Sequence, residues 1–192
     1  MNQQVSDTLK SMFQLPQNRI EQFLSICYIH TFKKNEFIEV KNKHFNRLGY
    51  ILNGATRTFF ENNQGDEISY LLQVNGDVIG DYASFITNEK AQVKIKTILT
   101  TEMLFFEKNH LDELIQNDIF WLAFAKRLSD LAFLSAKQRL DELFLYTPEL
   151  RYLNLLNKSH EIIQKIPQKY ISSYLGITPQ SLSRIRKRIS NK

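Results

Sequence analysis

The chain has 192 residues, of which 43% are hydrophobic, and a formal net charge of +5. This length accommodates one large or two small domains with a substantial core. The longest apolar run, 119–125, is too short to span a bilayer, so no membrane partner is expected. A single cysteine excludes an internal disulfide and fits a reducing compartment, and the first ten residues lack a signal-peptide pattern. A cytoplasmic protein is therefore expected.

Helices and then short strands are predicted for the first half of the chain. Apolar residues recur at helical spacing from Val5 to Leu24, with an interruption at Pro16. From Tyr28 to Phe106 the pattern changes to segments rich in β-branched and aromatic residues, separated by Asn-Gly and Gln-Gly pairs. Residues 62–65 (Asn-Asn-Gln-Gly) are typical of a hairpin loop. Strands at this spacing predict an antiparallel β-sandwich or β-barrel.

A long helix is predicted after a short helix near residues 110–115. Asn117 or Asp118 is suited to cap it, and it extends to about Tyr146. Its apolar positions cover more than one face, so it must be buried on more than one side. One face would cover the barrel, and the other would pair with the same helix of a second chain. The residues predicted for that pairing are Trp121, Ala125, Leu128 and Ala132. Complete burial within a monomer is the alternative.

Two further helices, joined by a tight turn, are predicted within residues 166–189. Pro167 suits a first helical turn, and Gly176 ends that helix in the left-handed conformation. Thr178 and Pro179 supply the N-cap and first residue of the next helix. At ~100° per residue, that second helix carries two opposed stripes. The apolar stripe holds Leu182, Ile185 and Ile189, and the polar stripe holds Gln180, Ser183, Arg184 and Lys187. This arrangement predicts a helix-turn-helix.

Basic residues are concentrated in this C-terminal segment. Residues 162–192 hold seven of the 25 Lys and Arg and none of the 20 Asp and Glu, which leaves residues 1–161 slightly acidic. A basic charge so confined indicates a polyanionic partner. In a major groove, Arg pairs with guanine and Gln with adenine, whereas Ser183, Lys187 and Arg188 suit phosphate contacts. An amphipathic helix with a solvated basic face is the alternative.

The segment YISSYLGITPQSLSRIRKRI resembles the helix-turn-helix of Crp/Fnr-type transcription regulators. Ser183 and Arg184 match the Ser-Arg pair of that family, and Gln180 stands where many members carry Glu. The resemblance implies that Gln180 and Arg184 read bases, with Ser183 beside them on a base or a phosphate. The order of elements resembles the same family along nearly the whole chain. One departure is that the chain ends about three residues after the second helix, where the family commonly continues into a strand pair.

Pattern and resemblance together imply an α+β fold. Its parts are an N-terminal antiparallel β-barrel (jelly-roll, cyclic-nucleotide-binding-like) with flanking helices over residues 1–117, a long dimerisation helix over 118–146, and a C-terminal helix-turn-helix domain over 147–192. The implied function is a homodimeric regulator of transcription that binds a near-palindromic operator in double-stranded DNA. A contact with RNA polymerase and an unidentified small-molecule effector are the other implied partners.

The effector site implied by the resemblance lies at Gly80, Asp81, Lys90 and Ala91. Family members that bind cyclic AMP carry Gly-Glu, a short helix and then Arg-Ala; the Glu binds the ribose and the Arg binds the cyclic phosphate. Asp is one methylene shorter than Glu, and Lys lacks the bidentate fork of Arg. Both differences argue against a cyclic nucleotide, and no cofactor is assigned.

Other functions find little support among the residues. One cysteine excludes an iron–sulfur centre, and Cys27 lies in an apolar stretch typical of a buried, inert thiol. The four histidines lack metal-ligand spacing, so no metal is expected, although a single histidine ligand to haem stays open. No phosphate loop or nucleophile–histidine pair indicates an enzyme. The main alternative is a ligand-binding or protein-interaction module whose basic tail binds nucleic acid nonspecifically.

Overall fold

The structure is a computed structural model that describes residues 3–40 and 42–190. Two helices open the chain, α1 (Gln3–Phe13) and α2 (Gln17–Ser25), and Pro16 separates them as predicted. The strands that follow are β1 (Cys27–Phe32), β2 (Phe37–Glu39), β3 (Arg47–Asn53), β4 (Ala55–Glu61), β5 (Glu67–Val74), β6 (Val78–Ile79), β7 (Lys94–Thr97) and β8 (Thr101–Glu107). A short helix, α3 (Tyr82–Thr87), connects β6 to β7.

The strands form two antiparallel sheets that pack face to face. Their orders are β1-β8-β3-β6 and β2-β7-β4-β5. The space between the sheets is filled by apolar side chains from both, among them Ile51 and Phe105 of the first sheet and Ile95 of the second. Alternating inward-facing positions on paired strands build such a core. This confirms the antiparallel β-sandwich or β-barrel predicted from the strand pattern.

The β4–β5 connection is a tight hairpin, as residues 62–65 predict. The Asn62 side-chain oxygen accepts hydrogen bonds from the backbone N–H groups of Gln64 and Asp66, at 2.9 and 2.8 Å. Gly65 adopts φ +84°, a conformation that glycine enters without steric cost. The side chain of Asn62 and the glycine thus account for the geometry of the turn.

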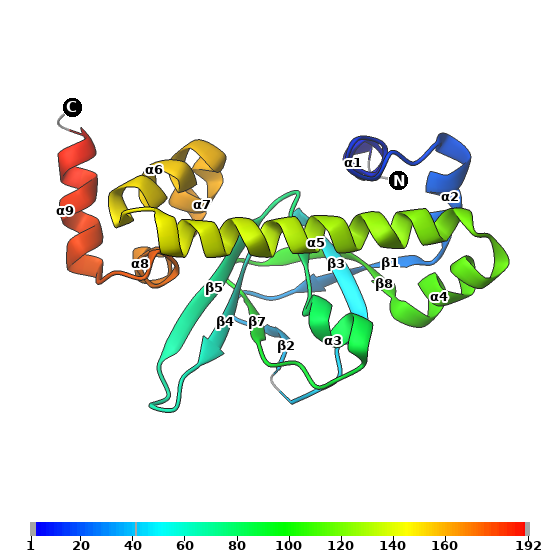
Figure 1. The fold of residues 1–192 in the computed structure, drawn as a ribbon, viewed down its shortest axis with the longest axis horizontal. Helices are drawn as coiled ribbons and strands as arrows, with labels where there is room; N and C mark the ends of the chain where they lie inside the picture. Colours follow the sequence, from blue (N-terminus) through cyan, green and yellow to red (C-terminus); the bar gives the residue numbers. More distant parts are fainter. Residues whose placement is uncertain (1–2, 41, 191–192) are drawn as a thin grey trace.

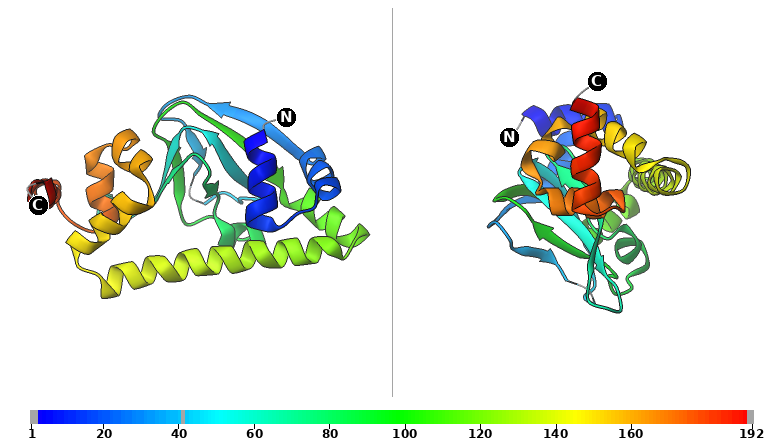
Figure 2. Two further views of the ribbon diagram at one scale, coloured as in Figure 1. Left: turned by 90° about the horizontal axis from the view of Figure 1, so that it is seen from above. Right: turned by 90° about the vertical axis from the view of Figure 1, so that its left-hand side faces the viewer.

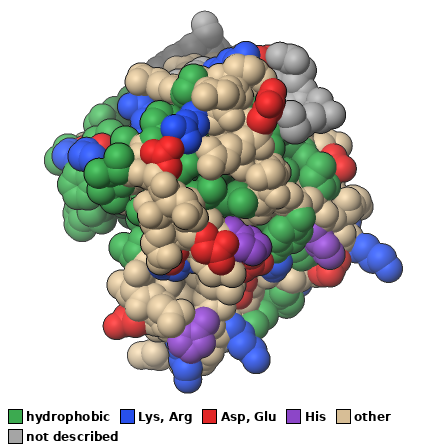
Figure 3. Space-filling model, turned by 90° about the vertical axis from the view of Figure 1, so that its right-hand side faces the viewer, with side chains coloured by type: hydrophobic (Ala, Val, Ile, Leu, Met, Phe, Trp, Pro, Cys, Tyr) green, Lys and Arg blue, Asp and Glu red, His purple; other side chains and the backbone are tan. Residues whose placement is uncertain are grey.

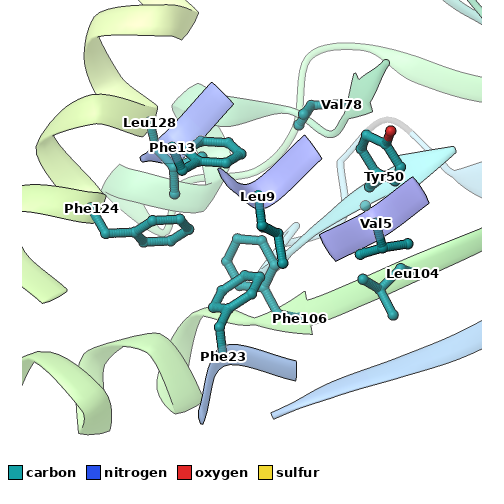
Figure 4. Close-up of a pocket in the computed structure, with 11 residues that line it drawn as sticks. Val5, Leu9, Phe13, Phe23, Tyr50, Val78, Leu104, Phe106, Phe124 and Leu128 are labelled. Carbon is teal, nitrogen blue, oxygen red and sulfur yellow. The ribbon is translucent and has the colours of Figure 1, made fainter. Parts of the chain in front are cut away.

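A layer of helices covers the outer face of the β3–β8 sheet. The core of this layer joins Ile20 and Phe23 of α2, Phe106 of β8, and Trp121 and Phe124 of the long helix. Phe23 contacts the rings of Phe106 and Phe124, with centroids 5.1 and 4.9 Å apart. A cavity of about 40 Å³ remains here, between α1 and the sheet, and apolar side chains point into it (Figure 4). A space of that size holds only a few water-sized groups.

The long helix α5 (Phe120–Leu145) follows α4 (Lys108–Asn117) and extends along most of the molecule (Figure 1). Of the two predicted caps, Asp118 serves: its carboxylate accepts a hydrogen bond from the Phe120 N–H at 2.9 Å and pairs with Arg19. Among the helices that the structure describes, none is long and apolar enough to cross a membrane.

Four helices complete the described chain: α6 (Pro148–Lys158), α7 (His160–Lys165), α8 (Gln168–Leu175) and α9 (Pro179–Ser190). Their core includes Ile162, Ile171 and Leu182, and it continues into Leu72 and Val74 of β5. The C-terminal helices therefore pack directly on the β4–β5 side of the sandwich, while α9 lies at the far end of the molecule (Figure 2).

Candidate nucleic-acid interface

The helices α8 and α9 are joined by a turn that the local sequence explains. Gly176 adopts φ +68° and ψ +34°, and its N–H donates to the Ser173 carbonyl at 3.1 Å. A left-handed residue at this position is a common way to end a helix. Thr178 then caps α9, because its hydroxyl oxygen accepts a hydrogen bond from the Ser181 N–H at 3.2 Å. Pro179 is the first residue of α9.

The two stripes predicted for the last helix face opposite environments. Leu182 and Ile185 are buried in the C-terminal core together with Leu175 of α8. The opposite stripe is exposed to solvent; it consists of Gln180, Ser183, Arg184, Lys187 and Arg188. Burial of the apolar stripe against α8 thus fixes which side chains α9 presents outward.

Arg188 differs from its neighbours in having an acidic partner on another helix. Its guanidinium lies 2.7 Å from the Glu149 carboxylate of α6. Exposed ion pairs contribute little to stability and weaken with salt. The pair therefore orients Arg188 within the outward stripe without burying its charge.

The charges of the two ends of the molecule differ. The exposed side of α9 carries Arg184, Lys187 and Arg188, and no acidic residue lies in residues 162–192. On the face at the opposite end, basic, acidic and histidine side chains are interspersed (Figure 3). The basic potential that would attract a polyanion is therefore concentrated around α9.

The residues predicted for the effector site take structural roles in the α3 loop. Asp81 caps α3: one carboxylate oxygen accepts from the Ser84 N–H at 3.1 Å, and the other accepts from the Gln92 N–H at 3.2 Å. Gly80 adopts φ +147°, and a Cβ there would lie 2.5 Å from a methyl of Leu48. Ala91 is buried and Lys90 is exposed. Both oxygens of Asp81 are thus already engaged by backbone donors of its own loop.

A second carboxylate lies near Asp81. Burial raises the pKa of Glu39, on β2, to about 7; the negative charge of Asp81 adds to the rise and Arg47 opposes it. Arg47 itself packs over the Phe105 ring and donates a hydrogen bond to the Tyr28 hydroxyl at 3.2 Å. Glu39 therefore places a second acidic group near Asp81, with the Arg47 guanidinium as the cation that acts on it.

The predicted dimerisation residues do not share an exposed face. Trp121 is fully buried and Leu128 is nearly so, both within the core formed with α2 and β8 of the same chain. Ala125 and Ala132 are half-buried. Trp121 and Leu128 are therefore covered by the chain's own core and are not part of an exposed apolar face.

A different stripe of α5 is apolar and exposed. At ~100° per residue its members lie within about 60° of one another, on the side away from Trp121 and Phe124. The stripe consists of Ile119, just before the helix, and Leu122, Phe133, Leu140 and Phe144. Phe133 is 68% exposed and Phe144 is 82% exposed. Apolar surface of this extent is typical of an interaction site.

Cys27 is partly buried at the start of β1. Its thiol donates to the Phe23 carbonyl at 3.2 Å, and burial raises its pKa to about 12. A thiol held this far from its thiolate form reacts slowly.

Two buried arginines that the sequence analysis gave no role contact α8. Arg57 of β4 lies over the Tyr170 ring, and Arg139 of α5 lies over the Tyr174 ring. Arg57 interrupts the otherwise uncharged run 55–60, which is a trace of it in the sequence pattern. Arg139 lies among the charged residues of 137–142, so the pattern gives no such sign of it.

Comparison with known proteins shows which family and which folds this chain resembles. Residues 29–118 match the family described as the cyclic nucleotide-binding domain. A search of curated proteins finds no match to the sequence. The part of the chain that holds the sandwich and the α3 loop is therefore similar to cyclic nucleotide-binding domains.

Solved structures extend the likeness beyond this domain. FixK2 from Bradyrhizobium japonicum has a TM-score of 0.70 and 16% identity, covering 86% of this chain and 85% of that chain. The catabolite activator protein of Thermus thermophilus has a TM-score of 0.60 and 18% identity, covering 96% and 87%. A protein from Eubacterium rectale described as a regulator of the crp/fnr family has a TM-score of 0.67 and 15% identity, covering 92% and 84%. Over most of its length the chain has the fold of Crp/Fnr-family transcription regulators.

Proposed function

We propose that this protein is a sequence-specific DNA-binding regulator of transcription. The observation that carries the proposal is the outward stripe of α9, which presents Gln180, Ser183 and Arg184 at one end of the molecule in a helix-turn-helix. Such a helix fits the major groove, where Arg and Gln form bidentate pairs with guanine and adenine. We call α9 the recognition helix below.

Within the recognition helix we assign two kinds of contact. Gln180 and Arg184 read bases, and Ser183 lies beside them on a base or a phosphate. Lys187 and Arg188 bind phosphates, which set the position of the helix but carry no sequence information.

The regulator acts as a homodimer through the exposed stripe of α5. Leu122 and Phe133 are 11 residues apart, and Phe133 and Leu140 are 7 residues apart. Both separations return to nearly the same side of a helix, as in a helix seam. Two copies related by a twofold axis would place their recognition helices in successive major grooves, ~34 Å apart. The operator would then be a near-palindrome.

The sandwich is the sensor part of this regulator, and its ligand is not a cyclic nucleotide bound in the manner of cyclic AMP-binding members. Asp81 is engaged by its own loop, Lys90 is exposed, and Glu39 adds a further carboxylate nearby.

Selection of bound sequences from a random duplex pool tests the proposal. The purified protein is expected to recover one near-palindromic motif and to bind it at least ~10³-fold more tightly than random DNA. Uniform binding of all sequences, with a steep salt dependence, would instead identify a nonspecific nucleic-acid-binding module.

A further inference from the structure

The helix α8 is held by one buried arginine from the sandwich. The Arg57 side chain is 4% exposed, and its Cζ lies 4.2 Å from the Tyr170 ring centroid and 4.3 Å from that of Phe59. Its Nε donates to the Ser69 hydroxyl at 2.9 Å and its Nη1 to the Glu67 carboxylate at 2.6 Å. Both acceptors lie on β5, so contacts within the sandwich fix the position of the guanidinium against which Tyr170 of α8 packs.

A second buried arginine, from the long helix, holds the other end of α8. Arg139 is 6% exposed, and its Cζ lies 3.7 Å from the Tyr174 ring centroid. Its Nη2 donates to the Tyr174 carbonyl, two residues before the glycine of the turn. The Tyr174 hydroxyl donates to Glu142 at 3.4 Å, and burial raises the Tyr174 pKa to about 12.

A backbone contact lies between these two points. The Ser69 N–H of β5 donates to the Ser173 hydroxyl at 2.9 Å, and that hydroxyl donates to the Glu67 carbonyl at 3.4 Å. Leu72 and Val74 of β5 also belong to one apolar core with Ile171 and Leu175 of α8. Apolar contacts are non-directional. A guanidinium that stacks on a ring and donates hydrogen bonds restricts the orientation of its partner, because its donors have fixed directions.

We propose that Arg57 with Tyr170, and Arg139 with Tyr174, form an α8 clamp that fixes the orientation of the recognition helix relative to the sensor sandwich and the long helix. The two arginines are positioning residues, since neither lies on the outward stripe of α9. Buried charges are a poor means of adding stability. Arg139 has an ion pair with Glu142 at 3.7 Å, but within the described chain its Nε and Nη1 make no hydrogen bond. The arrangement therefore holds α8 locally in one orientation and adds little to the global stability of the chain. The role of the clamp in DNA binding rests on the proposed function, in which α9 reads DNA.

Hydrogen exchange tests the clamp without DNA. Tyr170→Leu removes the ring that Arg57 covers, and Tyr170→Phe is the matched control because it keeps the ring and loses only the hydroxyl. We expect Tyr170→Leu to lower the protection of α8 amides by about tenfold, with β3 and β8 unchanged. Arg57→Met should lower the protection of α8 in the same way. Methionine keeps the apolar part of the buried side chain. Glu67, which loses its partner in this variant, has a side chain that is 45% exposed and stays hydrated. Wild-type protection of α8 in both variants would overturn the proposal.

Operator binding tests the consequence for DNA. Tyr170→Leu and Arg57→Met should weaken binding to the selected operator by about tenfold, because only a fraction of molecules then holds the competent orientation. Tyr170→Phe should bind as the wild type does. Unchanged or tighter binding in the two loosened variants would overturn the claim that the clamped orientation is the reading one. If the wild type binds no DNA, the proposed function fails, and hydrogen exchange still decides whether the clamp holds α8.

Discussion

Arg184 and Lys187 lie one turn apart on the exposed side of α9 and carry the same charge, yet their proposed contacts differ. Arg184→Ala should cost roughly 1–3 kcal/mol at the selected operator and relax specificity at one base pair, because a bidentate base contact is lost. Lys187→Ala, the matched control, should weaken operator and random DNA alike and reduce the salt slope by about one. Titrations at several salt concentrations measure both. An equal loss on all sequences for Arg184→Ala would reassign that residue to a phosphate.

Glu39 makes the stability of the folded chain depend on pH, in a direction that can be predicted. Its folded pKa, about 7, lies above the ordinary value of 4.5, so the folded state binds the proton more tightly than the unfolded state does. Stability contributed by this group is therefore complete below about pH 4.5 and is lost as the pH rises to about 7. Glu39→Gln should be more stable than the wild type at pH 8, and the difference should shrink toward pH 4.

Urea unfolding of both proteins across this range measures the difference. Glu113→Gln, at an exposed position of α4, is the control for the loss of a carboxylate. A difference between Glu39→Gln and the wild type that does not change with pH would show that Glu39 titrates normally in the folded chain.

Among the elements, the sequence predicts most closely the ends of those that begin or stop at a proline, a glycine or a capping side chain. Pro16, Asn62 to Gly65, Gly176 and Thr178 each act through local backbone chemistry, and each lies where the pattern predicts. The long helix could be predicted, but the side of it that meets the sandwich could not. A helix that is apolar on more than one side has no periodicity that distinguishes those sides. Trp121 and Leu128, predicted for pairing with a second chain, lie in the core of their own chain.

The exposed stripe of α5 leads to a prediction about assembly. Phe133→Arg places a charge in the proposed seam, where desolvation is costly, and should convert the dimer to a monomer. Because Phe133 is exposed in the single chain, the fold should be unaffected. Sedimentation or light scattering measures the mass. Ser135→Arg, exposed on the same helix but outside the stripe, is the control and should remain dimeric.

On the scale of the whole molecule, β4 explains why the site residues were only partly predictable. Residues 55–59 are all buried, since the sandwich covers one face of the strand and the C-terminal helices cover the other. A strand buried on both faces loses the alternation from which sequence reasoning infers its surroundings. The α8 clamp depends on such long-range packing, whereas the outward stripe of α9 follows from helical spacing alone.

The spacing of the operator tests how rigidly the whole molecule holds its recognition helices. A dimer that joins two long helices and two clamped α8 helices should tolerate only one separation between half-sites. Inserting two base pairs at the centre of the operator rotates one half-site by about 70° and moves it by about 7 Å. The wild type should therefore lose most of its preference for the altered operator over random DNA. Tyr170→Leu should bind the native operator less tightly. It should also discriminate less between the native and the lengthened operator, because its less constrained recognition helices can adapt to either spacing. An identical ratio of affinities in the two proteins would mean that the spacing is set by α5 without the clamp.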